Sequence, residues 1–166
     1  MQLQQFYFDA ADGIPNSPLP LLFIPAGLAE AATDGTVEDT IRGNGWSGTW
    51  VLPVFDFWHY HTTGHEVLVG FQGSGRIGFG GKHGHAVEMT PGDLVLIPAG
   101  VGHKRLDTSS DFAVLGAYPP GQDGTIVRAG DKDLDTARNE ISRLELPKQD
   151  PVTGRSPGLL ELWSAV

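Results

Sequence analysis

Residues 59–73 read HYHTTGHEVLVGFQG, and residues 92–103 read GDLVLIPAGVGH. Side chains two apart on a strand point to the same face, so His59 and His61 can direct two imidazoles into one cavity. Glu66 follows in the first stretch, and His103 ends the second stretch, 44 residues after His59. The glycines and the proline around these residues mark strand ends and loops. The two stretches therefore predict that four donor groups from distant parts of the chain converge on one metal ion.

The composition excludes several classes of protein. The chain has 166 residues, enough for one domain with a substantial core. It has no cysteine, so disulfides, cysteine-ligated zinc modules and thiol catalysis are excluded. The formal net charge is −9 and no basic cluster stands out, which predicts no nucleic-acid partner. The sequence shows no secretion signal and no apolar run of about eighteen residues, which predicts a soluble, cytoplasmic protein with no membrane partner.

The middle of the chain consists of short apolar runs, rich in Val, Ile, Phe and Trp, that are separated by Gly or Pro. This pattern is typical of many short strands in a sandwich or barrel. The stretch Gly80–Gly84 (GGKHG) is the clearest hairpin turn, because glycine takes the positive φ that such turns need. The predicted strands are 48–57, 66–71, 76–79, 85–89, 93–98, 103–106 and 112–118.

Both ends of the chain favour short helices. Apolar residues recur at helical spacing over 27–42, and Gly35 is a break that divides this region into one or two helices. The same spacing recurs over 133–145, where Asp131 or Asp133 can cap the first turn. We therefore expect an all-β body flanked by helices.

The last apolar segment is Leu159–Trp163, which we expect to pack on the chain's own body or on a second subunit. The chain is interpreted as a single domain, 1–166. Its expected parts are an N-terminal arm with short helices over 1–45, a β-barrel core over 46–128, and a C-terminal helix with a packing tail over 129–166.

With both motifs identified, the chain resembles the cupins, which are jelly-roll barrels of the double-stranded β-helix type. Their first motif carries HxH and a Glu, and their second carries Pro, Gly and a His. More narrowly, nearly the whole chain resembles the YjlB-like cupins, through segments such as Asn44-Gly45-Trp46 and Gly116-Ala117-Tyr118-Pro119. The residues that match the two cupin motifs are His59, His61, Glu66 and Gly73, then Gly92, Pro98, Gly100 and His103.

The resemblance implies one divalent metal ion held by His59, His61, Glu66 and His103. Three imidazoles and one carboxylate suit Fe, Mn, Ni, Zn, Co or Cu, and the ligand set does not choose between them. Glu66 could also serve as a base. His65 is an alternative ligand, because only one of two adjacent strand residues faces the metal and the family pattern selects Glu66.

Two further side chains are candidates for a substrate pocket. Arg105 shares strand parity with His103, and Gln72 shares it with Glu66. For Arg105 the alternative is a salt bridge with an acidic neighbour. His83 and His85 also form an HxH motif, but they flank a turn and are interpreted as exposed.

Two functions stay open at this stage. The first is a metal-dependent enzyme that acts on a small polar metabolite as an oxygenase, isomerase or lyase. The second is a non-catalytic module that binds a small molecule or a metal. In both, the partner is a small-molecule ligand, and cupins of this size commonly pair through sheet edges, which predicts a homodimer.

Overall fold

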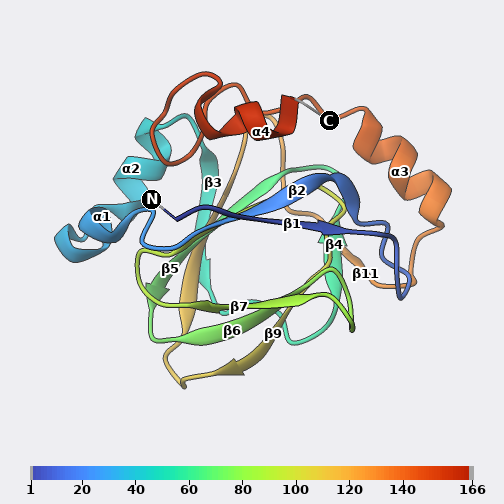
Figure 1. Ribbon diagram of the computed structural model, residues 1–166, viewed down its shortest axis with the longest axis horizontal. Coiled ribbons are helices and arrows are strands. Elements are labelled where there is room, and N and C mark those ends of the chain that lie inside the picture. Colours follow the sequence, from blue (N-terminus) through green and yellow to red (C-terminus); the bar gives the residue numbers. More distant parts are fainter. Residues whose placement is uncertain (1, 165–166) are drawn as a thin grey trace.

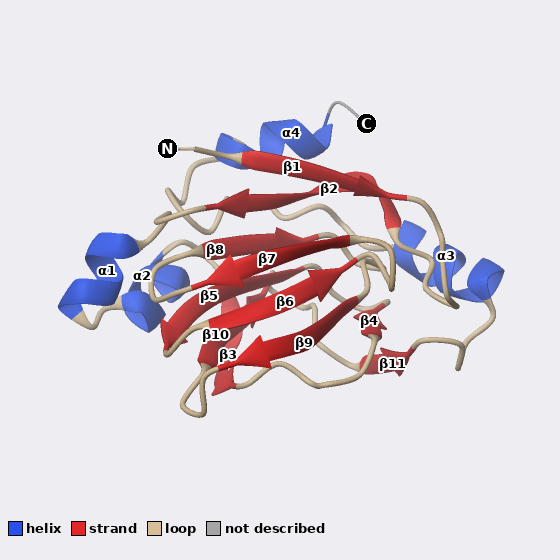
Figure 2. Cartoon of the chain, turned by 60° about the horizontal axis from the view of Figure 1, so that its bottom comes forward, coloured by secondary structure: helices blue, strands red, loops and turns tan. Residues whose placement is uncertain are grey.

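The computed structural model describes residues 2–164. Two antiparallel sheets pack face to face and form a jelly roll (Figures 1 and 2), which confirms the predicted all-β fold. The six-stranded sheet has the order β1 (Gln4–Phe8), β2 (Ser17–Ile24), β8 (Leu94–Ile97), β5 (Glu66–Gln72), β10 (Ala113–Tyr118), β3 (Ser47–Leu52). The five-stranded sheet has the order β11 (Ile126–Arg128), β4 (His59–His61), β9 (His103–Thr108), β6 (Gly75–Phe79), β7 (His85–Met89).

The predicted strands of the middle region are present, with one of them shortened. The expected strand 48–57 ends as β3 at Leu52, because Pro53 has no N–H for a ladder hydrogen bond. The chain then runs without regular structure to β4. The predicted hairpin turn joins β6 to β7, and Gly80 and Gly81 have φ values of 85° and 116°.

The segment 1–45, which was expected as an arm with short helices outside the core at 46–128, also contributes to the six-stranded sheet. The expected arm contains β1 and β2, which are two strands of the six-stranded sheet. Pro18 and Pro20 concealed β2, because proline usually marks a strand edge or a break. Its pairing with β8 begins only at Leu22, beyond both prolines, so these residues remove no hydrogen bond from that ladder.

The expected short helices lie at the periphery of the sheets, with α1 and α2 at one end and α3 at the other (Figure 2). Helix α1 (Ala29–Asp34) ends at Gly35, whose φ of 71° is left-handed, and α2 (Val37–Gly43) follows. Helix α3 (Leu134–Ser142) is capped by Asp133, whose carboxylate accepts from Thr136 N at 3.0 Å. Within residues 2–164, no helix combines the length and the apolar character needed to cross a membrane.

The C-terminal apolar segment packs on its own chain, which is one of the two expected arrangements. It forms a short 3-10 turn, η1 (Gly158–Leu160), and the helix α4 (Glu161–Ser164). The Trp163 side chain is 1% exposed, and its Nε1 donates to Pro20 O at 2.8 Å. Trp163 therefore closes an apolar layer over the outer face of the six-stranded sheet, together with Trp46 and Leu160.

Alternation along the central strands divides the core into two layers. Val67 and Val69 of β5 face the outer layer under the helices and the tail. Leu68 faces the inner layer between the two sheets. Glu66 has the same parity as Leu68, so it also points to the inside of the barrel. The strand pattern thus places the Glu66 carboxylate inside the barrel, at a position that an apolar side chain usually occupies.

Candidate metal centre

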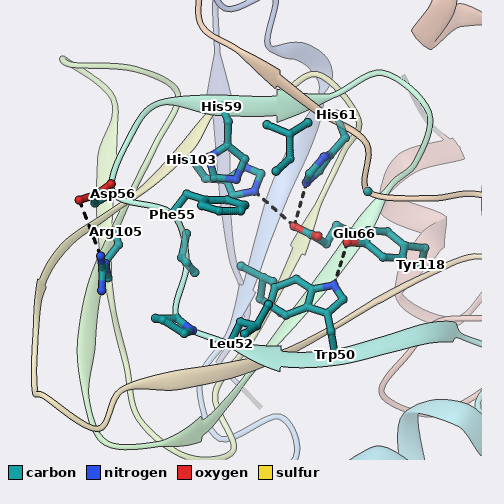
Figure 3. Close-up of a pocket in the computed structure, with 15 residues that line it drawn as sticks. Trp50, Leu52, Phe55, Asp56, His59, His61, Glu66, His103, Arg105 and Tyr118 are labelled. Carbon is teal, nitrogen blue, oxygen red and sulfur yellow. Dashed lines mark hydrogen bonds and ion pairs between the residues drawn. The ribbon is translucent and has the colours of Figure 1, made fainter.

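The candidate metal centre lies between the two sheets (Figure 3). His59 and His61 come from β4, His103 from the neighbouring β9, where it pairs directly with His59, and Glu66 from β5 in the opposite sheet. The four side chains are buried. One nitrogen from each of the three histidines lies within 4.8 Å of the others. Glu66 Oε1 lies 3.4 Å from His61 Nε2 and 3.3 Å from His103 Nε2.

Each of the three imidazoles is oriented by a hydrogen bond to the backbone. In every ring, Nδ1 contacts a carbonyl oxygen, which can only accept, so Nδ1 carries the proton. In a neutral imidazole, Nε2 then keeps its lone pair, which is the form that binds a metal. The contacts are His59 Nδ1 to Phe57 O at 3.0 Å, His61 Nδ1 to Thr125 O at 3.1 Å, and His103 Nδ1 to Val101 O at 3.1 Å.

When the rings are neutral, the Nε2 lone pairs of His61 and His103 face a carboxylate. The Nε2 atom of His61 is buried and has no hydrogen-bond partner among the described residues. Buried acceptors that face one another are unfavourable unless a cation lies between them. Two atoms that each lie about 2.1 Å from one ion are about 3.0 Å apart at a right angle, so the observed spacings suit a metal ion. The chemistry of the donor set therefore fits the metal that the sequence predicted.

The electrostatics of the four groups lead to the same conclusion. Burial, together with the neighbouring His103, lowers the pKa of His59 to about 3. Burial alone would raise the pKa of Glu66, but His61 and His103 outweigh this effect and hold the pKa below its usual range. Burial would lower the pKa of His61, and the Glu66 charge reverses this to a net rise. The carboxylate thus stays ionised and attracts a cation.

The structure places Glu66, and not His65, beside His61 and His103. His65 points away, and its Nδ1 accepts from Ala99 N at 2.9 Å. It lines a different cavity, between the β1–β2 region and α3. Burial lowers its pKa to about 4, so the ring is neutral at physiological pH. His65 is therefore a buried structural residue and not a ligand of this centre.

Acid is expected to destabilise the metal-free protein through His65. Its pKa falls from 6.5 to about 4 on folding, so the unfolded chain binds the proton more readily between these values. Its contribution is complete above pH 6.5 and declines as the pH falls towards about 4. His65→Asn keeps an acceptor for Ala99 and does not titrate. Denaturant unfolding at several pH values should show about 1–2 kcal/mol less acid destabilisation in this variant than in the wild type. Parallel pH curves for the two proteins would contradict this assignment.

The two predicted pocket residues have different positions. Arg105 lines the cavity next to the metal centre, and its Nη2 lies 3.8 Å from Asp56 Oδ2, so the salt-bridge alternative also holds. Gln72 is exposed, and its amide donates to Asp111 O at 2.8 Å. It does not line that cavity. The ladder between β5 and β10 shifts register at Ala113, opposite Gln72, which ends the regular alternation. The parity argument from Glu66 therefore did not apply at Gln72.

The cavity next to the metal centre has a volume of about 390 Å³. Trp50 and Tyr118 form part of its wall. Trp50 Nε1 donates to Tyr118 Oη at 2.8 Å (Figure 3). Burial and the Glu66 charge raise the pKa of Tyr118, which keeps its hydroxyl protonated. Gly116 leaves room for the Trp50 ring, because any side chain at this position would collide with it.

The second HxH motif lies far from this centre. His83 and His85 are exposed at the hairpin between β6 and β7, as expected. The His85 ring stacks on Phe6, with 4.0 Å between the ring centroids. Neither histidine belongs to the cluster of possible metal ligands among the described residues.

No protein-family model matches the chain. The uncharacterized protein YjlB of Bacillus subtilis (strain 168) is 42% identical over 161 residues, which cover 96% of this chain and 96% of that protein. The chain is also similar to the structure of acireductone dioxygenase from Bacillus anthracis with a cadmium ion in its active centre. That likeness has a TM-score of 0.36 and 24% identity, over 55% of this chain and 59% of the other.

A further structure is that of a proposed mannose-6-phosphate isomerase from Ralstonia eutropha JMP134, with a TM-score of 0.31 and 18% identity. The match covers 70% of this chain and 82% of the other. The identity to YjlB over nearly the whole length decides the family, and the two antiparallel sheets agree with it. The chain therefore belongs to the YjlB-like cupins.

Proposed function

We propose that His59, His61, His103 and Glu66 hold one divalent metal ion, and that the protein is a metal-dependent enzyme acting on a small molecule. The observation that carries this proposal is the grouping of three buried imidazoles, each bonded through Nδ1 to a backbone carbonyl, with Glu66 Oε1 3.4 and 3.3 Å from the Nε2 atoms of His61 and His103. The reaction is of the oxygenase, isomerase or lyase type. When bound, the ion would supply Lewis acidity or redox chemistry at the floor of the cavity.

The chain's own residues support chemistry on a bound molecule. The cavity opens directly onto the four ligands, so a molecule inside it would lie beside them (Figure 3). Glu66 is ionised and can accept a proton as well as bind the ion. The Tyr118 hydroxyl is held by Trp50 and stays protonated, so it can donate a hydrogen bond to an oxygen of the substrate. Leu68 and the Trp50 ring exclude water from one wall.

Elemental analysis of freshly purified protein, prepared without chelators or a metal-affinity tag, tests the metal centre. We expect about one transition-metal ion per chain. Iron or manganese would favour an oxygenase, and zinc or nickel would favour an isomerase or lyase. A protein that contains no metal, and that binds none on dialysis against these ions, would overturn the proposal.

A non-catalytic binding module is the second candidate. The observation in its favour is the short supply of proton-transfer groups. Apart from the three histidines, the titratable groups that line the cavity are Glu66, Tyr118 and the Arg105–Asp56 pair at its edge. Binding of a ligand that is recovered chemically unchanged, by protein with its metal in place, would favour this candidate.

We also propose a homodimer that forms through β3. Within the described sheets, β3 pairs only with β10, so its other edge is free, and its Val51, which does not line the cavity, is 39% exposed. A free apolar edge readily adds a further strand. Light scattering at micromolar concentration should give twice the mass of one chain, and Val51→Lys should shift the protein towards the monomer. A monomeric wild-type protein would contradict this expectation.

A further inference from the structure

We propose that the ligand of this cavity has a compact apolar body and an oxygen-bearing head that reaches the metal ligands. This inference rests on the proposed metal centre and names the substrate class that the centre takes. It replaces the polar metabolite that the sequence suggested. The argument depends on how polar and apolar groups are distributed between the floor, the wall and the rim of the cavity.

The polar groups of the cavity are concentrated at its floor. The three imidazoles and Glu66 are each at most 5% exposed; the imidazoles form one cluster, and Glu66 lies beside His61 and His103. The Tyr118 hydroxyl lies on the adjoining wall. The end of a ligand that reaches this floor can therefore bind the ion and make hydrogen bonds with buried groups. Oxygen donors of the enol, carboxylate or hydroxamate kind suit such a site.

Apart from the Arg105–Asp56 pair, the side chains of the wall and the rim are apolar. The wall includes Val54 and Leu68, which are 4% and 1% exposed. At the rim, Leu52, Phe55 and Ile126 are 55%, 45% and 38% exposed. They are three of the seven large apolar side chains that are exposed within residues 2–164, so exposed apolar surface is concentrated at this opening. Apolar side chains grouped at the mouth of a cavity are typical of a binding site.

The apolar rim begins directly beside the metal ligands. The Phe55 ring meets the His59 ring edge-on, with 5.4 Å between centroids, and stacks on Phe57 at 4.9 Å. The Arg128 guanidinium lies 3.9 Å from the centre of the Phe57 ring and covers it. Phe55 is thus supported from behind, and it forms a fixed apolar surface for the part of a ligand that leaves the floor.

The charges at the rim do not select a charged ligand body. Arg105 and Asp56 form an ion pair at 3.8 Å, so their charges largely cancel. Such a pair is worth little to stability, but it leaves no single charge to attract a carboxylate or an ammonium group. The cavity volume of about 390 Å³ is near the lower end of the range for small-molecule sites, which favours a compact body.

Two hydroxamates test the inference. Acetohydroxamate and benzohydroxamate share one metal-binding head and differ in a methyl or a phenyl body. Calorimetric titration of the Zn²⁺-loaded protein should show that benzohydroxamate binds about tenfold more tightly or better. Phe55→Ser should reduce this preference to less than about threefold without changing the affinity for Zn²⁺. Phe71→Ser is the matched control, because Phe71 is also exposed, at 42%, but does not line the cavity.

Equal affinities for the two hydroxamates in the wild type, or the same preference in Phe55→Ser, would overturn the inference. The same titrations with the metal-free protein, followed by NMR, separate it from the proposed function. Failure to bind Zn²⁺ would contradict the metal centre alone. A preference for the phenyl probe that persists in the metal-free protein and disappears in Phe55→Ser would still support the apolar pocket. If the metal-free protein showed no such preference, the apolar pocket would be contradicted.

Discussion

Replacing His103 with alanine is expected to lower the affinity for Zn²⁺ by more than about a hundredfold. His103 Nε2 lies 3.3 Å from Glu66 Oε1, and its ring centroid is 4.2 Å from that of His59, so it lies in the middle of the donor set. Its Nδ1–H is held by the Val101 carbonyl, which fixes the direction of the lone pair before any metal binds. The variant loses a ligand that no neighbouring side chain replaces among the described residues.

Competition between the protein and a chromophoric chelator measures this change directly. His85→Ala is the matched control, because His85 is an exposed histidine on β7, outside the donor cluster. It should bind Zn²⁺ as the wild type does. If His103→Ala retained the wild-type affinity while the protein stayed folded by circular dichroism, the proposed ligand set would be wrong.

The sequence predicted that His59 and His61 share one face, because that inference needs only local geometry. Period-two alternation places His59 and His61 on one face over only three residues of β4, a distance at which no bulge intervenes. The same reasoning failed over a longer distance, from Glu66 to Gln72, where the register shifts. The choice of Glu66 over His65 came from the family pattern, since alternation alone says only that one of the two faces inward.

Other features depend on tertiary structure, which the sequence pattern does not contain. The strand β2 was not predicted because Pro18 and Pro20 usually mark a break. The structure accommodates both, because they lie outside the ladder with β8. The exposure of the rim residues was not predicted for a different reason. Leu52 and Phe55 look like core residues in the sequence, and they are exposed only because β3 is an edge strand and Pro53 ends it.

Replacing Glu66 with glutamine is expected to change metal affinity and stability in opposite directions. The affinity for Zn²⁺ should fall by about a hundredfold, because a neutral amide is a much weaker ligand than a carboxylate. The metal-free protein should not lose stability, and we expect a gain of about 1 kcal/mol. The glutamine NH₂ can donate to the Nε2 atoms of His61 and His103, which now face an acceptor at 3.4 and 3.3 Å. Removing the carboxylate leaves no buried charge behind, since His61 can release its proton when the charge that raises its pKa is gone.

Unfolding of the wild type and of the variant, each without and with Zn²⁺, decides this prediction. Denaturant unfolding of the wild type and of Glu66→Gln without metal gives the sign of the stability change. Adding Zn²⁺ should stabilise the wild type strongly and the variant weakly, because a ligand stabilises only the state that binds it. Glu88→Gln, an exposed carboxylate on β7, controls for the loss of one negative charge and should behave as the wild type in both experiments. If Glu66→Gln destabilised the metal-free protein as well, Glu66 would serve mainly as a structural partner of the histidines. A stable metal-free variant with weakened metal affinity is the outcome expected of a carboxylate that needs a cation beside it.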